Sequence, residues 1–264
     1  MDDFGETLLA FKGVAVGAWL ALLFFAERLH PAVAFPDGRA WALLRPARNL
    51  AFLALSAVVS LAVVVPVSRW AAGLELGLRP ASARGGAGLL LDLLLLDFLI
   101  YWWHRANHRI GFLWRFHEVH HLDRFLDVTS AVRFHFGEVI LSALARAGVI
   151  VLFAMPLSSV LTFEALVLAG AAFHHSNLKL PHRLEKALSW LIVTPSIHWV
   201  HHHRIRNDTD SNYATVLSLW DRLFASRSMT PRTPKMEIGV EGREEQDLPL
   251  LLARPFRLRE AGGR

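Results

Sequence analysis

Long apolar runs dominate the hydrophobic pattern of this chain and predict membrane-spanning helices. The segment from Leu50 to Val67 carries no charge over eighteen residues, which is long enough to cross the hydrocarbon core of a bilayer. Thr7 to Ala26 forms a second run, and its single charge, Lys12, lies near one end, from where it can reach the headgroups. Leu89 to Trp103 forms a third run, which also contains two aspartates. The pattern therefore predicts three spans in the first part of the chain.

Two further apolar runs, from Val139 to Leu157 and from Ser159 to Phe173, predict a tight helical hairpin around Pro156. The hairpin contains Arg146 and Glu164, and a charge inside a membrane is costly unless it is paired. We therefore expect the hairpin either to enter a single leaflet of the bilayer or to pack against protein.

The composition supports a membrane protein. Of the 264 residues, 53% are hydrophobic, and the mean hydropathy is +0.35, which is high for a soluble domain of this length. Thr7 to Ala26 does not resemble a signal peptide, because acidic residues precede it and no small-residue cleavage site follows. We predict an all-α fold, namely a multi-span helical membrane protein with a histidine-rich cytoplasmic cap.

The basic residues predict the orientation of the spans. The net charge is +5 and the isoelectric point is near 10.2, but the arginines are spread over loops and tail without a basic groove for nucleic acid. Four arginines lie between Glu27 and Asn49 and five between His104 and Glu138, whereas none precedes Lys12. By the positive-inside rule, the N-terminus is outside and the histidine clusters and C-terminus are cytoplasmic. We expect an integral membrane protein, in the inner membrane if the cell is bacterial.

Nine of the fourteen histidines fall in two short stretches. The motif HRANH places two histidines at positions i and i+4, and the motifs HEVHH and HWVHH each place three at i, i+3 and i+4. On a helix, each set projects from one face. The histidines of the two stretches are His104, His108, His117, His120, His121, His198, His201, His202 and His203.

These faces predict a metal site for more than one ion. Histidine is the commonest transition-metal ligand, and a nitrogen-rich site suits iron, zinc, copper or nickel. A single zinc ion takes three or four ligands, so eight or more candidates indicate two metals. The chain has no cysteine, which excludes disulfides, iron–sulfur clusters and a thiolate-bound haem. A single HxxxH pair is weak support for a metal site, because exposed helices often carry one. Three histidine motifs at the ends of apolar runs are much stronger support.

Taken together, HRANH, HEVHH, FHHSN, TPSIHWVHH and NYATVLSLWDRLF resemble the fatty acid hydroxylase/sterol desaturase superfamily of membrane non-haem di-iron oxygenases. The resemblance covers roughly Asp97 to Phe224. It implies two iron ions, with zinc as a substitute in isolated protein, and O2 as co-substrate, which together hydroxylate or desaturate a lipid. By motif, the ligands would be His104, His108, His117, His120, His121, His175, His198, His201 and His202.

The chain departs from the family pattern at three places. The segment Arg133-Phe134-His135-Phe136 lacks the family's proline, Ala214 replaces a usual glycine, and Ala225-Ser226 replaces a Gly-Thr pair. These positions lie outside the ligand motifs, so they bear on the substrate and on loop shape. We expect the chain to comprise N-terminal transmembrane helices (1–88), a hydroxylase/desaturase catalytic region with the membrane hairpin (89–228) and a loosely packed C-terminal cytoplasmic tail (229–264), the last because the stretch from Met229 onward is rich in Pro, Arg and Glu.

Three further residues are candidates for holding the ligands in place by hydrogen bonds. Asp97 shares a helical face with Tyr101 and His104, and metal-bound histidines commonly donate their second N–H to a carboxylate. His135 and Asn177 are the other two candidates, although His135 and Glu138 are equally compatible with a satisfied polar pair. We expect no catalytic residue beyond the metal ligands. Asp92, in contrast, is expected to pair with Lys12 or Arg146.

Helical geometry separates neighbouring histidines. From His198, positions i+3 and i+4 lie about 60° and 40° away, so His201 and His202 can converge with it on one metal cluster. His203 lies about 140° away and should face protein or solvent. His174 lies about 100° from His175 and should not share its metal.

The chain predicts two kinds of partner and leaves two alternative functions open. The substrate would be a lipid from the bilayer, and electrons would come from a separate reductase, because haem, cluster and dinucleotide-binding motifs are missing. One alternative is a zinc-dependent membrane hydrolase with Glu118 or Glu138 as general base. The other is a metal-storage or transport protein without catalysis, which would place histidines along a pathway across the membrane.

Overall fold

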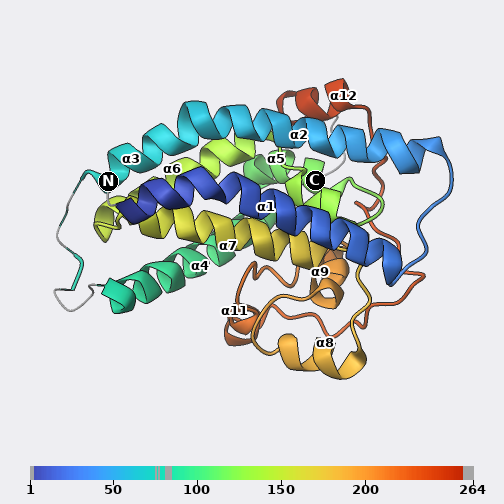
Figure 1. The fold of residues 1–264 in the computed structure, drawn as a ribbon. Helices are drawn as coiled ribbons and strands as arrows, with labels where there is room; N and C mark the ends of the chain where they lie inside the picture. Colours follow the sequence, from blue (N-terminus) through green and yellow to red (C-terminus); the bar gives the residue numbers. More distant parts are fainter. Residues whose placement is uncertain (1–2, 75, 77, 81–84, 258–264) are drawn as a thin grey trace.

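The computed structural model describes residues 3–257 except 75, 77 and 81–84, and within these residues it is helical without a β-strand (Figure 1). This confirms the predicted all-α fold. The helices of the main bundle are α1 (Asp3–Leu29), α2 (Arg45–Val59), α3 (Val65–Ala72), α4 (Gly85–Arg109), α6 (Phe136–Leu152) and α7 (Leu157–His175). The remaining helices are α5 (Gly111–His121), α8 (His182–Leu188), α9 (Pro195–His201), α10 (Arg206–Thr209), α11 (Leu219–Leu223) and α12 (Leu248–Ala253). Two π-helical turns, η1 (Ala40–Leu44) and η2 (Ser60–Val64), and two 3-10 turns, η3 (Val128–Val132) and η4 (Arg254–Phe256), complete the described structure.

Three helical segments are long and apolar enough to cross a membrane, namely Ala40–Ala72, Gly85–Arg109 and Leu157–His175. They contain the predicted spans from Leu50 to Val67 and from Leu89 to Trp103, together with the second arm of the hairpin. The predicted span from Thr7 to Ala26 lies within α1, but the side chains of its first residues, Lys12 included, fall outside the described part of the chain.

Prolines explain why the span Ala40–Ala72 contains two π-helical turns. Pro46 and Pro66 each follow a π turn by two residues, and proline has no N–H to continue the ladder of hydrogen bonds. Each turn before a proline takes one extra residue and the helix does not break, so Arg45 N–H bonds to Ala40 O and Val65 N–H bonds to Ser60 O. Because the helix is continuous from Ala40 to Ala72, it begins ten residues before the span expected from the apolar pattern.

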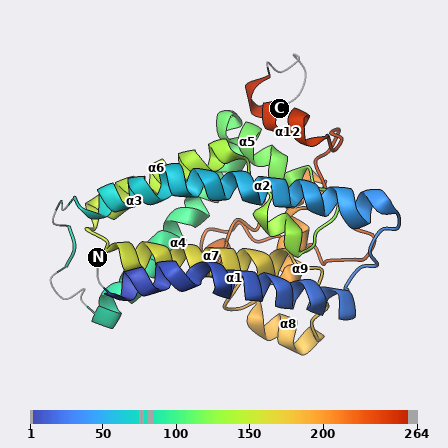
Figure 2. The ribbon, with the colours of Figure 1, turned by 45° about the horizontal axis from the view of Figure 1, so that its top comes forward.

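The long helices form one bundle in which α1 packs along α7 and α3 packs along α6 (Figures 1 and 2). The hairpin of α6 and α7 turns at Ala154, whose φ of 46° is left-handed, and Pro156 sets the start of α7. An ion pair of 3.3 Å between Arg146 and Glu164 links the two arms and neutralises both charges.

Of the two partners expected for Asp92, Arg146 pairs with Glu164 instead, and the side chain of Lys12 lies outside the described part of the chain. The Asp92 carboxylate accepts hydrogen bonds of 2.7 and 3.1 Å from Arg79 and one of 2.7 Å from Ser159 Oγ. Arg79 lies in the connection before α4, which the apolar pattern treats as a loop. A loop arginine therefore reaches back and satisfies the buried carboxylate.

A buried ionic network joins the start of α2 to the loop after α5. Arg45 is 3% exposed and donates to Asp123 at 2.6 Å and to Asp127 at 2.7 Å. It also donates to Ser130 Oγ at 2.8 Å, and Asn49 donates to the Asp123 carboxylate at 3.2 Å. Buried charges need such partners, so this network fixes the first span against the histidine-bearing region.

We define the cap as α5, η3, everything from α8 to η4, and the loops between them; it lies at the end of the bundle where α7 finishes. The C-terminal segment is part of the cap, which corrects the expectation of a loosely packed tail. Leu251 is fully buried, Glu245 accepts a 2.7 Å hydrogen bond from Arg133, and Arg254 donates to Glu118 at 2.8 Å. Alternating Arg and Glu in this segment thus form specific pairs with the cap. Residues 258–264 lie outside the described structure.

Candidate metal centre

The ends of four helices bring nine buried histidines together beneath the cap. They come from α4, from α5, from the last residue of α7, and from α9 with the residue that follows it. Each is 9% exposed or less. They form two groups, and within each group one ligand nitrogen per histidine lies within 4.8 Å of all the others. The five-histidine cluster is His104, His108, His117, His121 and His201, and the four-histidine cluster is His120, His175, His198 and His202.

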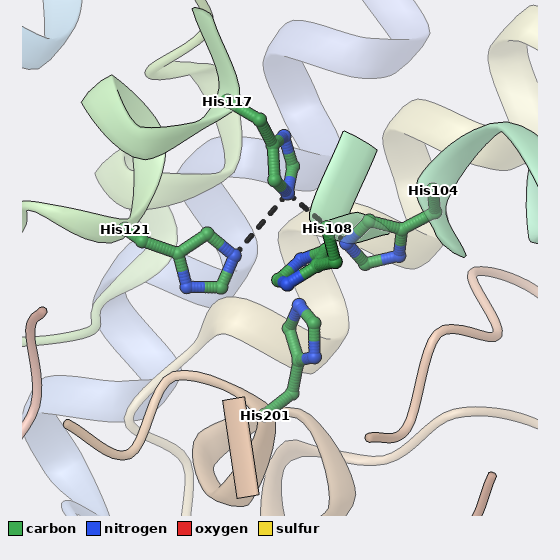
Figure 3. Close-up of side chains that lie close together, drawn as sticks. All are labelled: His104, His108, His117, His121 and His201. Carbon is green, nitrogen blue, oxygen red and sulfur yellow. Dashed lines mark hydrogen bonds between the residues drawn. The ribbon is translucent and has the colours of Figure 1, made fainter. Parts of the chain in front are cut away.

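Local sequence turns these helix ends toward one another. Ile110 is extended, with φ −99° and ψ 111°, so the chain changes direction between α4 and α5. The histidines of HRANH and HEVHH consequently face each other across a short turn. Pro195 at the first position of α9 favours the start of a new helix, which carries His198 and His201. Figure 3 shows the rings of the five-histidine cluster directed toward a common centre.

Each HxxHH motif contributes to both clusters. In α5, His117 and His121 join the five-histidine cluster, whereas His120 joins the other one. In the second motif, His198 and His202 belong to the four-histidine cluster, whereas His201 crosses to the first. The reason is geometric, because positions i+3 and i+4 lie on opposite sides of position i around a helix. The expectation that His201 converges with His198 on one cluster is therefore wrong.

Hydrogen bonds at the outer edge of the centre set the tautomer of five histidines. In each of them Nδ1 faces only an acceptor, so Nδ1 carries the proton and Nε2 carries the lone pair. Four of the acceptors are backbone carbonyls and one is a carboxylate. The pairs are His104 with Tyr213 O at 2.8 Å, His117 with Glu138 at 2.9 Å, His120 with Arg133 O at 3.2 Å, His175 with Ala171 O at 2.8 Å, and His201 with Ser211 O at 2.6 Å.

The inward nitrogen atoms then face one another without a proton to share. His104 Nε2 lies 3.1 Å from His117 Nε2, and His120 Nε2 lies 3.0 Å from His175 Nε2. With both Nδ1 atoms protonated, each of these contacts opposes two lone pairs, which repel. A cation between the nitrogens turns this repulsion into coordination. The donor set therefore fits a metal ion in each cluster, and all-imidazole ligation suits iron or zinc.

Unpartnered nitrogen atoms support the same conclusion. His108 Nε2 and His201 Nε2 are buried and have no hydrogen-bond partner among the described residues. A buried polar atom without a partner costs about 1–3 kcal/mol, so such atoms in a folded chain indicate a ligand.

Burial keeps the cap histidines in the neutral form that binds metal. Removal from water lowers the pKa of His120, His121, His198 and His202 well below the ordinary value of 6.5, and the neighbouring imidazoles lower it further. For His201, burial lowers the pKa to about 3 even though the bond to Ser211 O opposes the change. Neutral imidazole is the ligating species, so the site is ready for metal near neutral pH.

Asp97 makes its hydrogen bonds away from the histidines, which corrects its expected role. Its carboxylate accepts from Trp220 Nε1 at 2.7 Å and from Leu217 N at 3.2 Å. Helical periodicity predicted the face of α4 from which the Asp97 side chain projects, but it could not predict the partner of that side chain. Asp97 instead attaches the segment before α11 to the span α4.

His135 and Asn177 also bind elsewhere than at the ligands. His135 Nδ1 accepts from Gly137 N at 3.0 Å, which caps α6, and its Nε2 lies 3.1 Å from Leu252 O. The Asn177 side chain exchanges hydrogen bonds with the backbone of Val33 at 3.0 and 2.7 Å. Both side chains therefore bind segments that are distant in sequence. Closeness in sequence to a histidine motif does not determine which segment packs against a polar side chain in the folded protein.

Glu138 is the side chain that orients a cluster histidine. Its Oε1 accepts from His117 Nδ1 at 2.9 Å and from Asn107 Nδ2 at 3.1 Å. From the sequence, Glu138 could either support the histidines or form a polar pair with His135. In the structure it accepts the hydrogen bond of a cluster histidine, His117. The carbonyls of Tyr213, Ser211 and Arg133 could not be found from sequence, because every residue has a carbonyl.

Two neighbouring histidines lie outside both clusters, as helical geometry predicted. His203 Nδ1 bonds to Asp208 Oδ2 at 2.7 Å and faces away from the centre. His174 is buried, with its ring centroid 3.9 Å from that of His198, but it does not join the four-histidine cluster.

Glu118, a candidate general base for the hydrolase alternative, does not face the clusters. It accepts a 2.8 Å hydrogen bond from Arg254 and lies 3.8 Å from Arg243. The other candidate, Glu138, is held by His117 and Asn107. These contacts count against the zinc-dependent hydrolase hypothesis, which needs a glutamate that is available as a general base at the metal.

Comparisons with known proteins agree with the geometry. The fatty acid hydroxylase profile matches residues 89–226. An ornithine lipid hydroxylase from Rhizobium tropici is 29% identical over 168 residues, which cover 64% of this chain and 50% of that protein. An alkylglycerol monooxygenase from Xenopus tropicalis is 32% identical over 150 residues, or 57% of this chain and 32% of its own length.

A very-long-chain aldehyde decarbonylase from Arabidopsis thaliana is 30% identical over 146 residues, which cover 50% of this chain and 22% of that protein. The chain thus spans half or less of the length of these three relatives. No solved structure matches it.

Proposed function

Because this chain belongs to the fatty acid hydroxylase family, we propose that it is an oxidoreductase that hydroxylates a membrane lipid with O2. The observation that carries the proposal is the convergence of nine histidines, through protonless nitrogens, into two clusters. Hydroxylation is favoured over desaturation because two of the three relatives compared above are named as a hydroxylase and a monooxygenase.

The proposed cofactor is a pair of iron ions, one for each cluster, which zinc can replace in isolated protein. Bound iron would supply the oxidising power that an unactivated C–H bond requires. In the overall reaction, R–H and O2 take up two electrons and two protons and yield R–OH and water. A separate electron-transfer protein supplies the two electrons, and we propose that it docks on the cytoplasmic face.

The chain itself supplies geometry and exclusion of water. Glu138 and four backbone carbonyls fix the tautomer and direction of five rings. Aromatic rings shield the centre, with Phe134 stacked on His120 at 4.4 Å and Trp114 lying 5.0 Å from His108. A dry, rigid centre protects a strong oxidant from side reactions.

The apolar spans supply access for the lipid. Helices α4 and α7 cross the membrane and end at the histidines, so a lipid can approach from the side without leaving the bilayer. We propose that residues 89–228 form the catalytic region after the N-terminal spans of residues 1–88. We also propose that the histidines and the C-terminal segment 229–264 are cytoplasmic, as the arginine distribution indicates.

Labelled oxygen tests the proposal. Protein purified without oxygen and loaded with ferrous iron is given a lipid extract, a reductase system and 18O2, and the lipids are measured by mass spectrometry. We expect one labelled oxygen in a lipid product and two iron ions per chain. His121→Ala removes a cluster histidine and should abolish the product. A lipid hydrolysed without oxygen uptake, or full activity of His121→Ala, would refute the proposed chemistry.

A further inference from the structure

The cap carries an exposed apolar surface that the metal centre does not use. Trp190 and Leu191, which follow α8, are 66% and 65% exposed, and Leu219 and Leu223 of α11 are 48% and 63% exposed. We call these four residues the apolar foot. Figure 1 shows α8 and α11 on the same side of the molecule as α4. A group of large apolar side chains exposed together indicates a binding surface.

The apolar foot is held as one rigid unit. The Arg222 guanidinium stacks on the Trp190 ring at 4.5 Å and donates to Trp190 O at 2.9 Å. Ser218 N donates to Leu191 O at 3.1 Å and its hydroxyl donates to Ser189 O at 2.8 Å. These bonds join the turn after α8 to the start of α11. The exposure of the foot is therefore built into the fold.

Helix α11, which carries Leu219 and Leu223 of the foot, contacts a membrane-spanning helix through Trp220 and through Phe224, the residue that follows it. The ring of Trp220 lies 5.3 Å from that of Phe98, and the ring of Phe224 lies 5.0 Å from that of Trp102. Trp220 Nε1 also donates to Asp97, the residue before Phe98 on the same helix. Both Phe98 and Trp102 belong to the span Gly85–Arg109 and are partly exposed. The foot thus continues the surface that α4 presents to lipid.

Its composition matches the boundary between lipid headgroups and acyl chains. Tryptophan is enriched at that boundary because its ring is apolar and its N–H is polar. Exposed basic side chains lie close to the foot in sequence, namely Arg183 and Lys186 on α8 and Arg227 after α11. Basic residues next to an apolar face are typical of segments that lie in the membrane interface.

We propose that the apolar foot inserts into the interface of the same bilayer that α4 spans and thereby sets the height of the metal centre above the membrane. The foot and the histidines are linked by short chain segments. Leu191 lies seven residues before His198, and Val193 N donates to Val216 O at 3.0 Å, three residues after the Tyr213 carbonyl that holds His104. A fixed height would select which carbon of a lipid reaches the metal, a consequence that rests on the proposed function.

Spin labels measure the depth of the foot. The chain contains no cysteine, so Leu191→Cys and Leu223→Cys each provide a single labelling site without further changes. The full chain is reconstituted in phosphatidylcholine vesicles, and accessibility of the label is measured to oxygen, which concentrates in the bilayer, and to a water-soluble nickel chelate. Ile205→Cys is the matched control, because Ile205 is 53% exposed on the cap and apolar but lies outside the foot.

We expect both foot labels to favour oxygen over the nickel chelate, whereas the Ile205→Cys label favours the chelate. Foot labels that behave like the control would overturn the proposal. Labels shielded from both reagents and broadened by a second label would show a second copy of the chain on the foot, which also overturns it. The readout needs neither metal nor turnover, so an inactive preparation leaves the test intact.

A second pair of variants tests the effect on the reaction. Leu191→Glu and Leu223→Glu place charges on the foot and should keep two bound metals while changing the ratio of lipid products oxidised at different carbons. The corresponding control is Ile205→Glu, which should change neither. An unchanged product ratio in both foot variants would refute the role of the foot in setting the height of the centre.

Discussion

Acidification of the metal-free protein should unfold the histidine-rich cap while the membrane spans stay helical. The perturbation is a fall in pH from 7 to about 4.5. The groups concerned are the five of the six cap cluster histidines whose pKa burial lowers, namely His120, His121, His198, His201 and His202. In an unfolded cap, these side chains return to a pKa of about 6.5.

The direction follows from the proton balance. A histidine whose folded pKa is depressed contributes full stability above pH 6.5, and that stability is lost as the pH falls below 6.5 toward the folded pKa. Each such group costs about 1.4 kcal/mol per pH unit once the unfolded form is fully protonated, so five together cost about 7 kcal/mol per unit below about pH 5.5. A typical domain has a free energy of unfolding of about 5–15 kcal/mol, so a further fall of about two pH units is enough to unfold the cap.

Hydrogen exchange resolves the cap from the spans and is the assay of choice. In the metal-free protein, amides of α5 and α9 should lose protection between about pH 6 and pH 4.5. Metal-loaded protein should lose protection at lower pH, because metal binds only the neutral imidazoles and stabilises the folded cap. A metal-free cap that stays protected at pH 4, or a transition that metal does not shift, would show that the histidines are not buried neutral ligands.

Three further predictions concern single residues. His202→Ala should lower bound metal to one equivalent or less by elemental analysis, whereas His203→Ala, which removes only a bond to Asp208, should keep both metals. Glu138→Ala should weaken metal binding by about 10- to 100-fold in a chelator competition, while Glu138→Gln, which keeps the acceptor for His117, should recover most of it; equal losses would refute the orienting role. Arg45→Met removes the arginine from the buried Asp127 and leaves Asp123 with only the more distant Arg133 at 4.0 Å, so it should destabilise the protein by about 3–5 kcal/mol in thermal unfolding, which an unchanged melting temperature would contradict.

The spans and eight of the nine clustered histidines were predictable because both depend on local periodicity, whereas the ninth, His175, was predicted only from the family resemblance. Apolar runs mark the spans from Leu50 to Val67 and from Leu89 to Trp103, and the spacing i, i+3, i+4 places histidines on one helical face. Residues that act through contacts distant in sequence were not predictable. Asp97 binds Trp220, which is 123 residues away, and nothing in the spacing of the first motif indicates that partner.

The division of the histidines between two clusters also lay beyond sequence. His120 and His121 are neighbours in one motif, yet they belong to different clusters, because α7 supplies a histidine to the cluster of His120, whereas α4 supplies two to the cluster of His121. The tail shows the same limit. Its Arg and Glu content is typical of a solvated extension, and only the folded cap provides the partners that order Glu245 and Arg254.

The crossing of the two HxxHH motifs would make the two proposed metal sites thermodynamically dependent on each other. Helix α5 supplies ligands to both clusters, as do α9 and the residue after it, so an ion in one cluster orders the two segments that the other cluster needs. The first ion bears the conformational entropy of fixing these segments, and the second binds to ligands already in place. We therefore expect cooperative loading, with chains that hold one metal as the least populated form during assembly. Mismetallation follows the same rule, because a wrong ion in one cluster strengthens whatever occupies the other.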